Sequence, residues 1–240
     1  MNKIIYEDEI LENLDKISMK IIQKKEGFRF GVDAIMLAYF LKLKSNANVL
    51  EIGTGTGIIS LELAYHYKNS KITAVEIQKD MAFMSMRSVK YNQLEDRIEI
   101  LNKDVKKLEG SSTFDVIVSN PPYMPLNEGK ISPNEIKALS RHEIKLNLEE
   151  LLSESKRLLK VGGSLNIIYR TNRFYELLSL LEKYSFSPKR LRFIYSKEGT
   201  ESILFMIEVI KARKVSLNIE EPLYIFDKDG NYTEELQSYY

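Results

Sequence analysis

Apolar and polar positions follow two periods in turn from about Ala47 onward. Short apolar runs are separated by longer stretches in which apolar residues recur with helical spacing. This order is typical of a parallel sheet whose strands are joined by crossover helices. The expected strands are Asn48 to Ile52, Lys71 to Glu76, Arg97 to Leu101, Phe114 to Ser119 and Ser164 to Tyr169.

Helices are expected between these strands, and a closing pair of strands is expected after them. The helical stretches lie near Ile58 to Tyr67, Lys79 to Tyr91 and Leu148 to Leu159, the last stopped by Gly162-Gly163. Two further apolar runs, Leu191 to Ser196 and Ser202 to Ile210, flank a turn-like connection and indicate an antiparallel pair. We predict a Rossmann-like α/β fold: a mostly parallel twisted sheet, helices on both faces and an antiparallel final strand.

The chain is expected to form a single domain. Residues 1–46 contain an amphipathic segment, the stretch Gly27-Phe28-Arg29-Phe30-Gly31 and a helix from Asp33 to Leu43, which is too little for a second domain. We expect this segment to cover a core of residues 47–210, with an acidic extension at 211–240. Pro125 to Pro133 is the most loop-like interior segment.

The amino-acid composition excludes sites built from cysteine and argues against sites built from several histidines. Without cysteine the chain has no disulfide, thiolate metal site, iron–sulfur cluster or cysteine nucleophile. His66 and His142 are too few for a histidine metal cage, so we expect no metal. Acidic residues stand where a signal peptide would be apolar, and no run is long enough to span a membrane, so a cytosolic location is expected.

Charge is unevenly distributed although the net charge is only +1. Basic residues dominate three stretches, residues 16–29, 156–173 and 183–214, whereas residues 215–240 carry six acids against Lys228 alone. These stretches can contact phosphates of a nucleic acid, or they can be ordinary solvated faces.

A glycine-rich turn follows the first predicted strand. It reads Glu51-Ile52-Gly53-Thr54-Gly55-Thr56-Gly57 and leads directly into a helical pattern. Glycines there let the backbone turn tightly and approach a ligand, although a tight turn without a ligand is the alternative. The dinucleotide fingerprint would place its third glycine at position 58, where Ile58 stands, and this disfavours an oxidoreductase.

Four successive strands are predicted to end in polar side chains. Glu51 and Glu76 end the first two strands, and Asp104 and Asn120 directly follow the next two. The carboxyl ends of an open parallel sheet form its ligand crevice. Glu76 can there accept hydrogen bonds from both ribose hydroxyls of a nucleoside, and Asp104 can reach an adenine amino group. Taken alone, each acid can equally be a helix cap or a solvated loop carboxylate.

The fourth strand leads into Asn120-Pro121-Pro122-Tyr123, the most specific signal in the chain. Two prolines fix the backbone and remove donors, so the Asn120 side-chain oxygen and the Pro121 carbonyl can both accept from a substrate NH₂ group. Tyr123 offers an aromatic face on which a planar base can stack. The alternative is a rigid turn, since Asn-Pro and Pro-Pro commonly mark turns.

These motifs resemble the amino-group methyltransferases with an N-P-P-Y motif, which include adenine and release-factor glutamine methyltransferases. More closely, the chain resembles the bacterial tRNA-valine adenine-37 N6-methyltransferase family, which has the class I methyltransferase fold. Four further segments carry that resemblance over nearly the whole chain: Gly27 to Ala34, Arg141 to Glu143, Arg190 to Tyr195 and Asp227 to Thr233.

The resemblance implies methyl transfer from S-adenosylmethionine to N6 of an adenine in tRNA, most closely adenine-37 of tRNA-Val. It implies a tRNA substrate, contacted by the three basic stretches, and no membrane or obligate protein partner. The catalytic residues would be Asn120, Pro121, Pro122 and Tyr123. The cofactor-binding residues would be Phe28, Arg29, Phe30, Glu51, Gly53, Gly55, Gly57, Glu76, Ile77, Asp104, Val105 and Asn120.

Some of these residues have structural alternatives. The resemblance implies that Asp33 lies over the cofactor pocket with Phe28 and Phe30, but the phenylalanines can be core residues and Asp33 can cap the following helix. Arg141 and His142 can touch RNA or lie on an exposed loop.

Two rival functions stay open. One is a glutamine methyltransferase for a release factor, whose substrate amide would fit the same N-P-P-Y site; 46 residues are few for the N-terminal domain of those enzymes. The other is a cofactor-binding RNA partner without catalysis, which would not need the pair of acceptors at Asn120 and Pro121.

Overall fold

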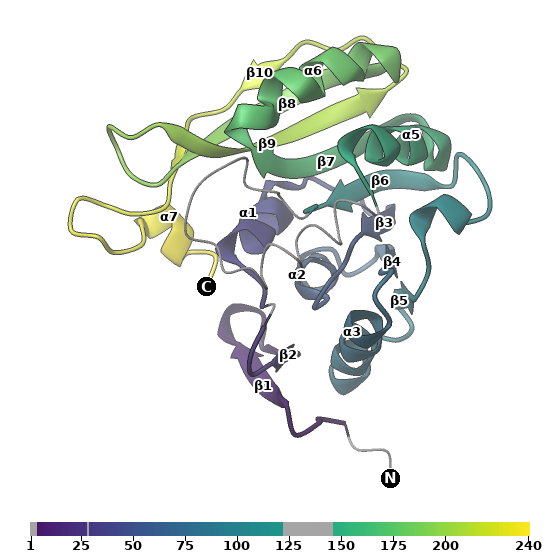
Figure 1. The fold of residues 1–240 in the computed structure, drawn as a ribbon, viewed down its shortest axis with the longest axis vertical. Coiled ribbons are helices and arrows are strands. Elements are labelled where there is room, and N and C mark those ends of the chain that lie inside the picture. The colour runs from purple at the N-terminus through teal and green to yellow at the C-terminus, as the bar shows by residue number, and fades with distance from the viewer. Residues whose placement is uncertain (1–3, 28, 122–145) are drawn as a thin grey trace.

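The computed structural model describes residues 4–27, 29–121 and 146–240. Within them, nine strands form one sheet, in the order β10-β8-β9-β7-β6-β3-β4-β5 with β11 also paired to β8 (Figure 1). The strands are β3 (Asn48–Ile52), β4 (Lys71–Val75), β5 (Ile98–Leu101), β6 (Phe114–Ser119), β7 (Leu159–Arg170), β8 (Phe186–Tyr195), β9 (Ser202–Lys211), β10 (Asn218–Ile219) and β11 (Leu223–Tyr224).

Helices cover both faces of this sheet. They are α1 (Val32–Phe40), α2 (Ile58–His66), α3 (Lys79–Tyr91), α5 (Leu148–Leu158), α6 (Phe174–Lys183) and α7 (Glu234–Gln237). Alternate strand residues face opposite sides, so Val49 packs in the cluster with α1 and α2, whereas Leu50 packs in the cluster with α5 and α6. All pairs from β5 to β7 are parallel, and β9 runs antiparallel to both β7 and β8. The predicted fold class is confirmed.

The sequence pattern located most elements but not all of them. The predicted helix from Asp33 ends at Phe40 rather than Leu43, because Leu41 is extended. Helix α6 was not predicted. The expectation that Gly162-Gly163 stop the preceding helix is wrong, because α5 ends at Leu158 and both glycines lie inside β7. They lie where the β6–β7 register shifts, and a Cβ at Gly163 would be 2.9 Å from the Asp115 carbonyl oxygen.

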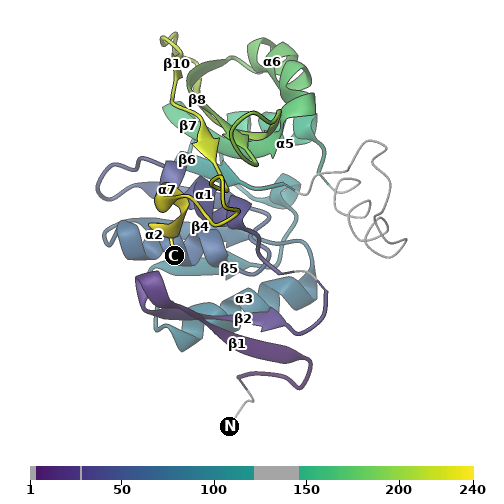
Figure 2. The ribbon, with the colours of Figure 1, turned by 90° about the vertical axis from the view of Figure 1, so that its left-hand side faces the viewer.

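The amphipathic N-terminal segment is a β-hairpin, which the sequence did not predict. Strands β1 (Glu9–Leu14) and β2 (Met19–Lys24) pair antiparallel and lie along α3 (Figure 2). The N–H of Ile22 donates to the Ser88 hydroxyl at 3.0 Å, and Ile22 packs with Met84. Because Leu14 and Ile21 of this segment and Leu236 of α7 join the cluster around α1 and α2, both end segments pack on the core.

None of the described helices is both long and apolar enough to cross a membrane.

Arg190 on β8 ties four parts of the chain together. Its side chain is buried, and its nitrogens donate to Glu208, to Glu220 at 3.0 Å and to the Phe40 carbonyl at 2.6 Å. The guanidinium also lies 4.1 Å from the centre of the Phe40 ring. A buried cation held by two carboxylates and a carbonyl is a structural group.

Arg190→Met is expected to lower the free energy of unfolding by about 3 to 5 kcal/mol, because it leaves the buried Phe40 carbonyl without its donor and the buried Glu208 carboxylate with Lys189 as its remaining cation. Lys42→Ala is the matched control: Lys42 is 73% exposed and lies 3.8 Å from Glu220, so its loss should cost less than about 1 kcal/mol. Urea unfolding of both variants measures the difference. Equal losses would contradict the role assigned to Arg190.

Candidate functional site

The loop between β3 and α2 forms a backbone cradle at the carboxyl edge of the sheet. The N–H groups of Gly53 and Thr54 both donate to the Val75 carbonyl, at 2.9 and 3.2 Å. Gly53 and Gly55 have φ angles of 76° and 55°, which favour glycine. A Cβ at Gly53 would project into open space. A ligand can therefore lie directly against this backbone.

Gly57 has a different reason to be glycine. It has a φ of 91° at the N-cap position of α2, and a Cβ there would lie 3.1 Å from the Cβ of Ser85 on α3. The third glycine of the motif thus allows α2 to start in a left-handed conformation close to α3.

Glu76 fixes the cradle from the end of β4. Its carboxylate is buried and accepts from the N–H of Gly55 at 3.0 Å and from that of Gln78 at 2.8 Å. The Asn102 side chain donates to the Glu76 carbonyl at 2.8 Å. Sequence reasoning missed Asn102, although an amide directly after a strand at this edge was a usable signal.

Glu51 lies at the end of β3 and is fully enclosed. The Ser60 hydroxyl at the start of α2 donates to its carboxylate. Burial raises the pKa of Glu51 to about 7, against the opposing effect of the hydroxyl hydrogen bonds. Glu51 is therefore protonated over a wider pH range than an exposed glutamate.

The residues expected to surround an adenine differ in exposure. Asp104 caps a single helical turn, Val105–Lys107, by accepting from the Lys106 N–H at 3.0 Å, which is the alternative considered for this acid. Val105 is buried in the core, whereas Ile77 is 36% exposed at the end of β4. Of the two, only the Ile77 side chain presents apolar surface at this edge.

Asn120 lies at the end of β6, next to the glycine loop. Its side-chain nitrogen donates to Oδ2 of Asp33 at 3.0 Å, across 87 positions of sequence. Asp33 lies in the first turn of α1, where its Oδ1 accepts from the Ala34 N–H. The N-cap residue is Gly31, so the alternative that Asp33 is the N-cap of this helix is wrong. A Cβ at Gly31 would be 2.5 Å from Asp33 Oδ1, so glycine there makes room for this carboxylate.

The segment before α1 contributes mainly structural contacts. Arg29 pairs with Glu12 on β1, and the Phe30 N–H donates to the buried Gln23 side chain at 3.1 Å. The Phe30 ring packs against the core, as its structural alternative proposed. Phe28, Pro122, Tyr123, Arg141 and His142 lie outside the described residues.

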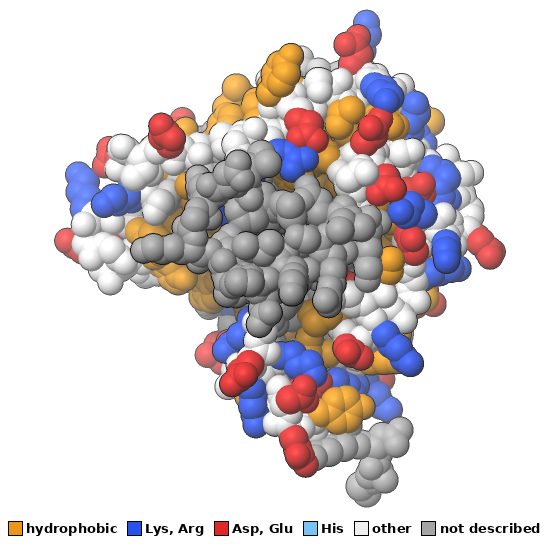
Figure 3. All heavy atoms as spheres, in the orientation of Figure 1, with side chains coloured by type: hydrophobic (Ala, Val, Ile, Leu, Met, Phe, Trp, Pro, Cys, Tyr) orange, Lys and Arg blue, Asp and Glu red, His pale blue; other side chains and the backbone are white. Residues whose placement is uncertain are grey.

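Several basic side chains of the three basic stretches form ion pairs with acidic side chains of the same chain. Arg192 pairs with Glu235, Arg157 with Glu154 and Arg173 with Glu176. Basic and acidic side chains are accordingly interspersed on the face shown in Figure 3. With Arg190 buried as well, the number of basic residues in these stretches overstates the charge available to a phosphate.

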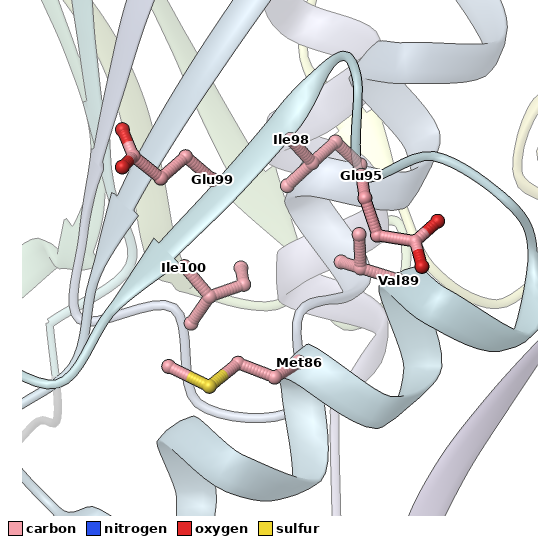
Figure 4. A pocket seen from close by; sticks show the side chains of 6 residues that line it. All are labelled: Met86, Val89, Glu95, Ile98, Glu99 and Ile100. Atoms are coloured by element: carbon pink, nitrogen blue, oxygen red, sulfur yellow. The ribbon is translucent and has the colours of Figure 1, made fainter.

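A hollow of about 320 Å³ lies between α3 and β5 at the outer edge of the sheet (Figure 4). It contains none of the predicted site residues; its lining is Met86, Val89, Glu95, Ile98, Glu99 and Ile100. Across the described ranges, no cluster of three acidic or histidine side chains could hold a metal ion.

A family model and a curated relative both match this chain, and both are methyltransferases. The methyltransferase small domain model matches residues 31–188. A tRNA1(Val) (adenine(37)-N6)-methyltransferase from Phocaeicola vulgatus is 30% identical over 207 residues, covering 85% of this chain and 87% of the relative.

Solved structures share the fold at low identity. A predicted O-methyltransferase from Agrobacterium tumefaciens has a TM-score of 0.69 at 19% identity, covering 86% of this chain and 94% of that one. The M. jannaschii TYW2 structure, a complex with AdoMet, has a TM-score of 0.59 at 14% identity, covering 86% and 88% of the two chains.

The buried Glu51 carboxyl predicts a pH dependence of stability. Its folded pKa of about 7 exceeds the ordinary value of 4.5, so between these values the folded protein binds the proton more tightly than the unfolded chain. Stability should therefore fall as pH rises through this window, by about 2 to 3 kcal/mol from pH 5 to pH 8 for this group. Glu51→Gln should remove that part of the slope in urea unfolding across the same pH series. An unchanged slope would refute the assignment.

Proposed function

The chain belongs to the methyltransferase small domain family and to the family of the tRNA1(Val) (adenine(37)-N6)-methyltransferases, and we propose that it catalyses the reaction named by the latter. The enzyme transfers a methyl group from S-adenosylmethionine to N6 of adenine-37 in a valine tRNA. An enzyme that acts on tRNA is expected to work in the cytoplasm.

Four features of the carboxyl edge of the sheet fit the cofactor. The open space beside Gly53 accommodates a ligand against the backbone, and the exposed Ile77 side chain offers an apolar surface for a base. Glu76, already held by two N–H groups, presents its carboxylate at the end of β4 for the ribose hydroxyls. Asp104 supplies an acceptor for the adenine amino group from the end of β5.

The observation that carries the proposal is the Asn120–Asp33 hydrogen bond beside the glycine loop. With its nitrogen donating to Asp33, the Asn120 amide has its oxygen on the other branch, and an amide oxygen is an acceptor for an amine. This is the property required of a group that selects and orients NH₂. The fixed orientation of Asn120 favours amino-group methylation over oxygen or carbon methylation.

The mechanism requires orientation more than acid–base strength. When bound, S-adenosylmethionine supplies an electrophilic methyl group with a good leaving group. Asn120 and the Pro121 carbonyl accept hydrogen bonds from the adenine amine, which hold its nitrogen in line and turn its lone pair from the ring toward the methyl group. Such positioning can supply on the order of 7 to 11 kcal/mol.

Glu76→Ala is expected to weaken cofactor binding by about 1.5 to 3 kcal/mol, because it removes an ionised acceptor from the ribose and releases the Gly55 N–H. Titration calorimetry with S-adenosylmethionine measures this, and thermal unfolding checks that the variant is folded. A folded variant with wild-type affinity would exclude the ribose contact.

Asn120→Ala is expected to reduce the single-turnover rate by roughly 10²-fold or more while leaving cofactor affinity largely intact. Asp33→Ala should reduce it by about tenfold or more, because it removes the hydrogen bond that Asp33 accepts from the Asn120 amide nitrogen. Asp80→Ala is the matched control, since Asp80 also lies in the first turn of a helix, α3. If Asp33→Ala behaves like Asp80→Ala, Asp33 does not orient Asn120.

The target is tested by incubating the enzyme and labelled cofactor separately with total tRNA, a release factor and duplex DNA. Nucleoside mass spectrometry should find N6-methyladenine in valine tRNA, next to the anticodon. Label on glutamine, or on DNA adenine with tRNA unlabelled, would reject this target.

A further inference from the structure

The segment after β9 returns to the carboxyl edge of the sheet. Strand β11 pairs parallel with β8, matching Leu223 to Ile194 and Tyr224 to Tyr195. The next residues continue beyond the carboxyl end of β8, where the Phe226 N–H donates to the Ser196 carbonyl at 2.8 Å. Because β8 runs parallel to β6, this is the edge at which Asn120 lies.

Three aromatic rings follow one another in this segment. The rings of Phe226 and Tyr232 are 5.4 Å apart between centroids and inclined by 18°, and those of Tyr232 and Tyr240 are 5.9 Å apart and inclined by 10°. All three side chains are partly exposed, at 37%, 39% and 46%. We call Phe226, Tyr232 and Tyr240 the aromatic row.

The tail does not need the aromatic row for its attachment. Leu236 is fully buried, and Tyr239 stacks on Tyr39 of α1 at 4.2 Å between ring centroids. Figure 2 shows α7 and the C-terminus lying against α1 and α2. These internal contacts hold the tail, whereas the aromatic row presents ring surface to solvent, which is characteristic of a binding surface.

Two lysines lie at the outer end of the aromatic row. Lys197 and Lys228 line a hollow of about 300 Å³ together with Phe226 and Asp227, whose carboxylate accepts from the N–H groups of Asp229 and Asn231. Lys228 is 89% exposed, and Glu198, 3.9 Å away, is itself 72% exposed, so this ion pair is weak and leaves the lysine able to bind another anion. An aromatic face beside two ammonium groups matches a nucleotide, whose base stacks and whose phosphate is anionic.

The inner end of the aromatic row lies on the α1 side of the tail. Tyr239, next to Tyr240, stacks on Tyr39 of α1, and Asp33 lies in the first turn of the same helix. Burial and the neighbouring Tyr232, Asp33 and Glu62 raise the pKa of Tyr240 to about 12, in keeping with this placement. The aromatic row thus extends from the lysine-lined hollow toward the helix that carries Asp33.

We infer that the aromatic row stacks the unpaired nucleotides flanking the target adenine of the RNA loop, with Lys197 and Lys228 contacting their phosphates. This inference rests on the proposed function. Bases of an anticodon loop lack pairing partners, so an aromatic surface beside the active site can receive them without melting a duplex. Stacking on an aromatic ring is tolerant of base identity. The aromatic row can therefore orient the RNA loop without reading its sequence.

Phe226→Leu and Tyr232→Leu test the inference, because leucine keeps apolar bulk and removes the aromatic face. Each should weaken binding of an unmodified valine tRNA transcript about fivefold or more. Cofactor affinity should stay within about twofold, because the aromatic row lies away from the glycine loop. Tyr91→Leu is the matched control. Tyr91 is 38% exposed and is the last residue of α3, which packs beside β5, at the other end of the strand order from β8.

A second measurement does not depend on the variants folding. An anticodon stem-loop carrying 2-aminopurine beside the target adenine should change its fluorescence on binding the wild-type protein. Unchanged tRNA affinity in folded leucine variants, or bound RNA with no fluorescence change, would overturn the inference. Methylation of tRNA adenine by the wild type is measured separately, so failure of the proposed function is distinguishable from failure of the stacking surface.

Discussion

The parallel register of β3 between β4 and β6 is the constraint on which the site depends. Glu51 pairs with Ala74 on one side and with Val118 on the other, so the three strands end within a residue or two of each other. Gly53, Glu76 and Asn120 are thereby brought to one edge from positions up to 67 residues apart. A register shift of one residue would reverse the inward and outward faces and separate these groups.

Buried carboxylates at this edge are in two different environments. Glu76 accepts two backbone N–H groups and thereby shapes the glycine loop, so its polarity is satisfied by the fold itself. Glu51, one strand away, is enclosed with the Ser60 hydroxyl, and burial raises its pKa. The two acids thus have separate roles: Glu76 holds the backbone of the glycine loop, and Glu51 links β3 to α2.

Both end segments of the chain lie near Asp33 and the candidate site. The N-terminal segment brings Asp33 to Asn120, and the tail brings Tyr240 within electrostatic range of the same aspartate. Arg190 stabilises this arrangement, because it joins β8 to the end of α1 and to Glu220 before β11. The end segments, which the sequence suggested only as a cover and an acidic extension, are therefore continuous with the site.

The sequence determined the alternation of strands and helices, because buried strands and amphipathic helices differ in apolar period. It also located the glycine loop, the acids and Asn120, because these lie at strand ends. It could not reveal the β1–β2 hairpin, whose stability comes from packing on α3, or distinguish Gly162-Gly163 as a helix stop from the bulge required against Asp115. Only the tertiary structure decided that Asp33 holds Asn120 and that Arg190 is buried, because hydrogen bonds and burial between residues distant in sequence exist only after the chain has folded.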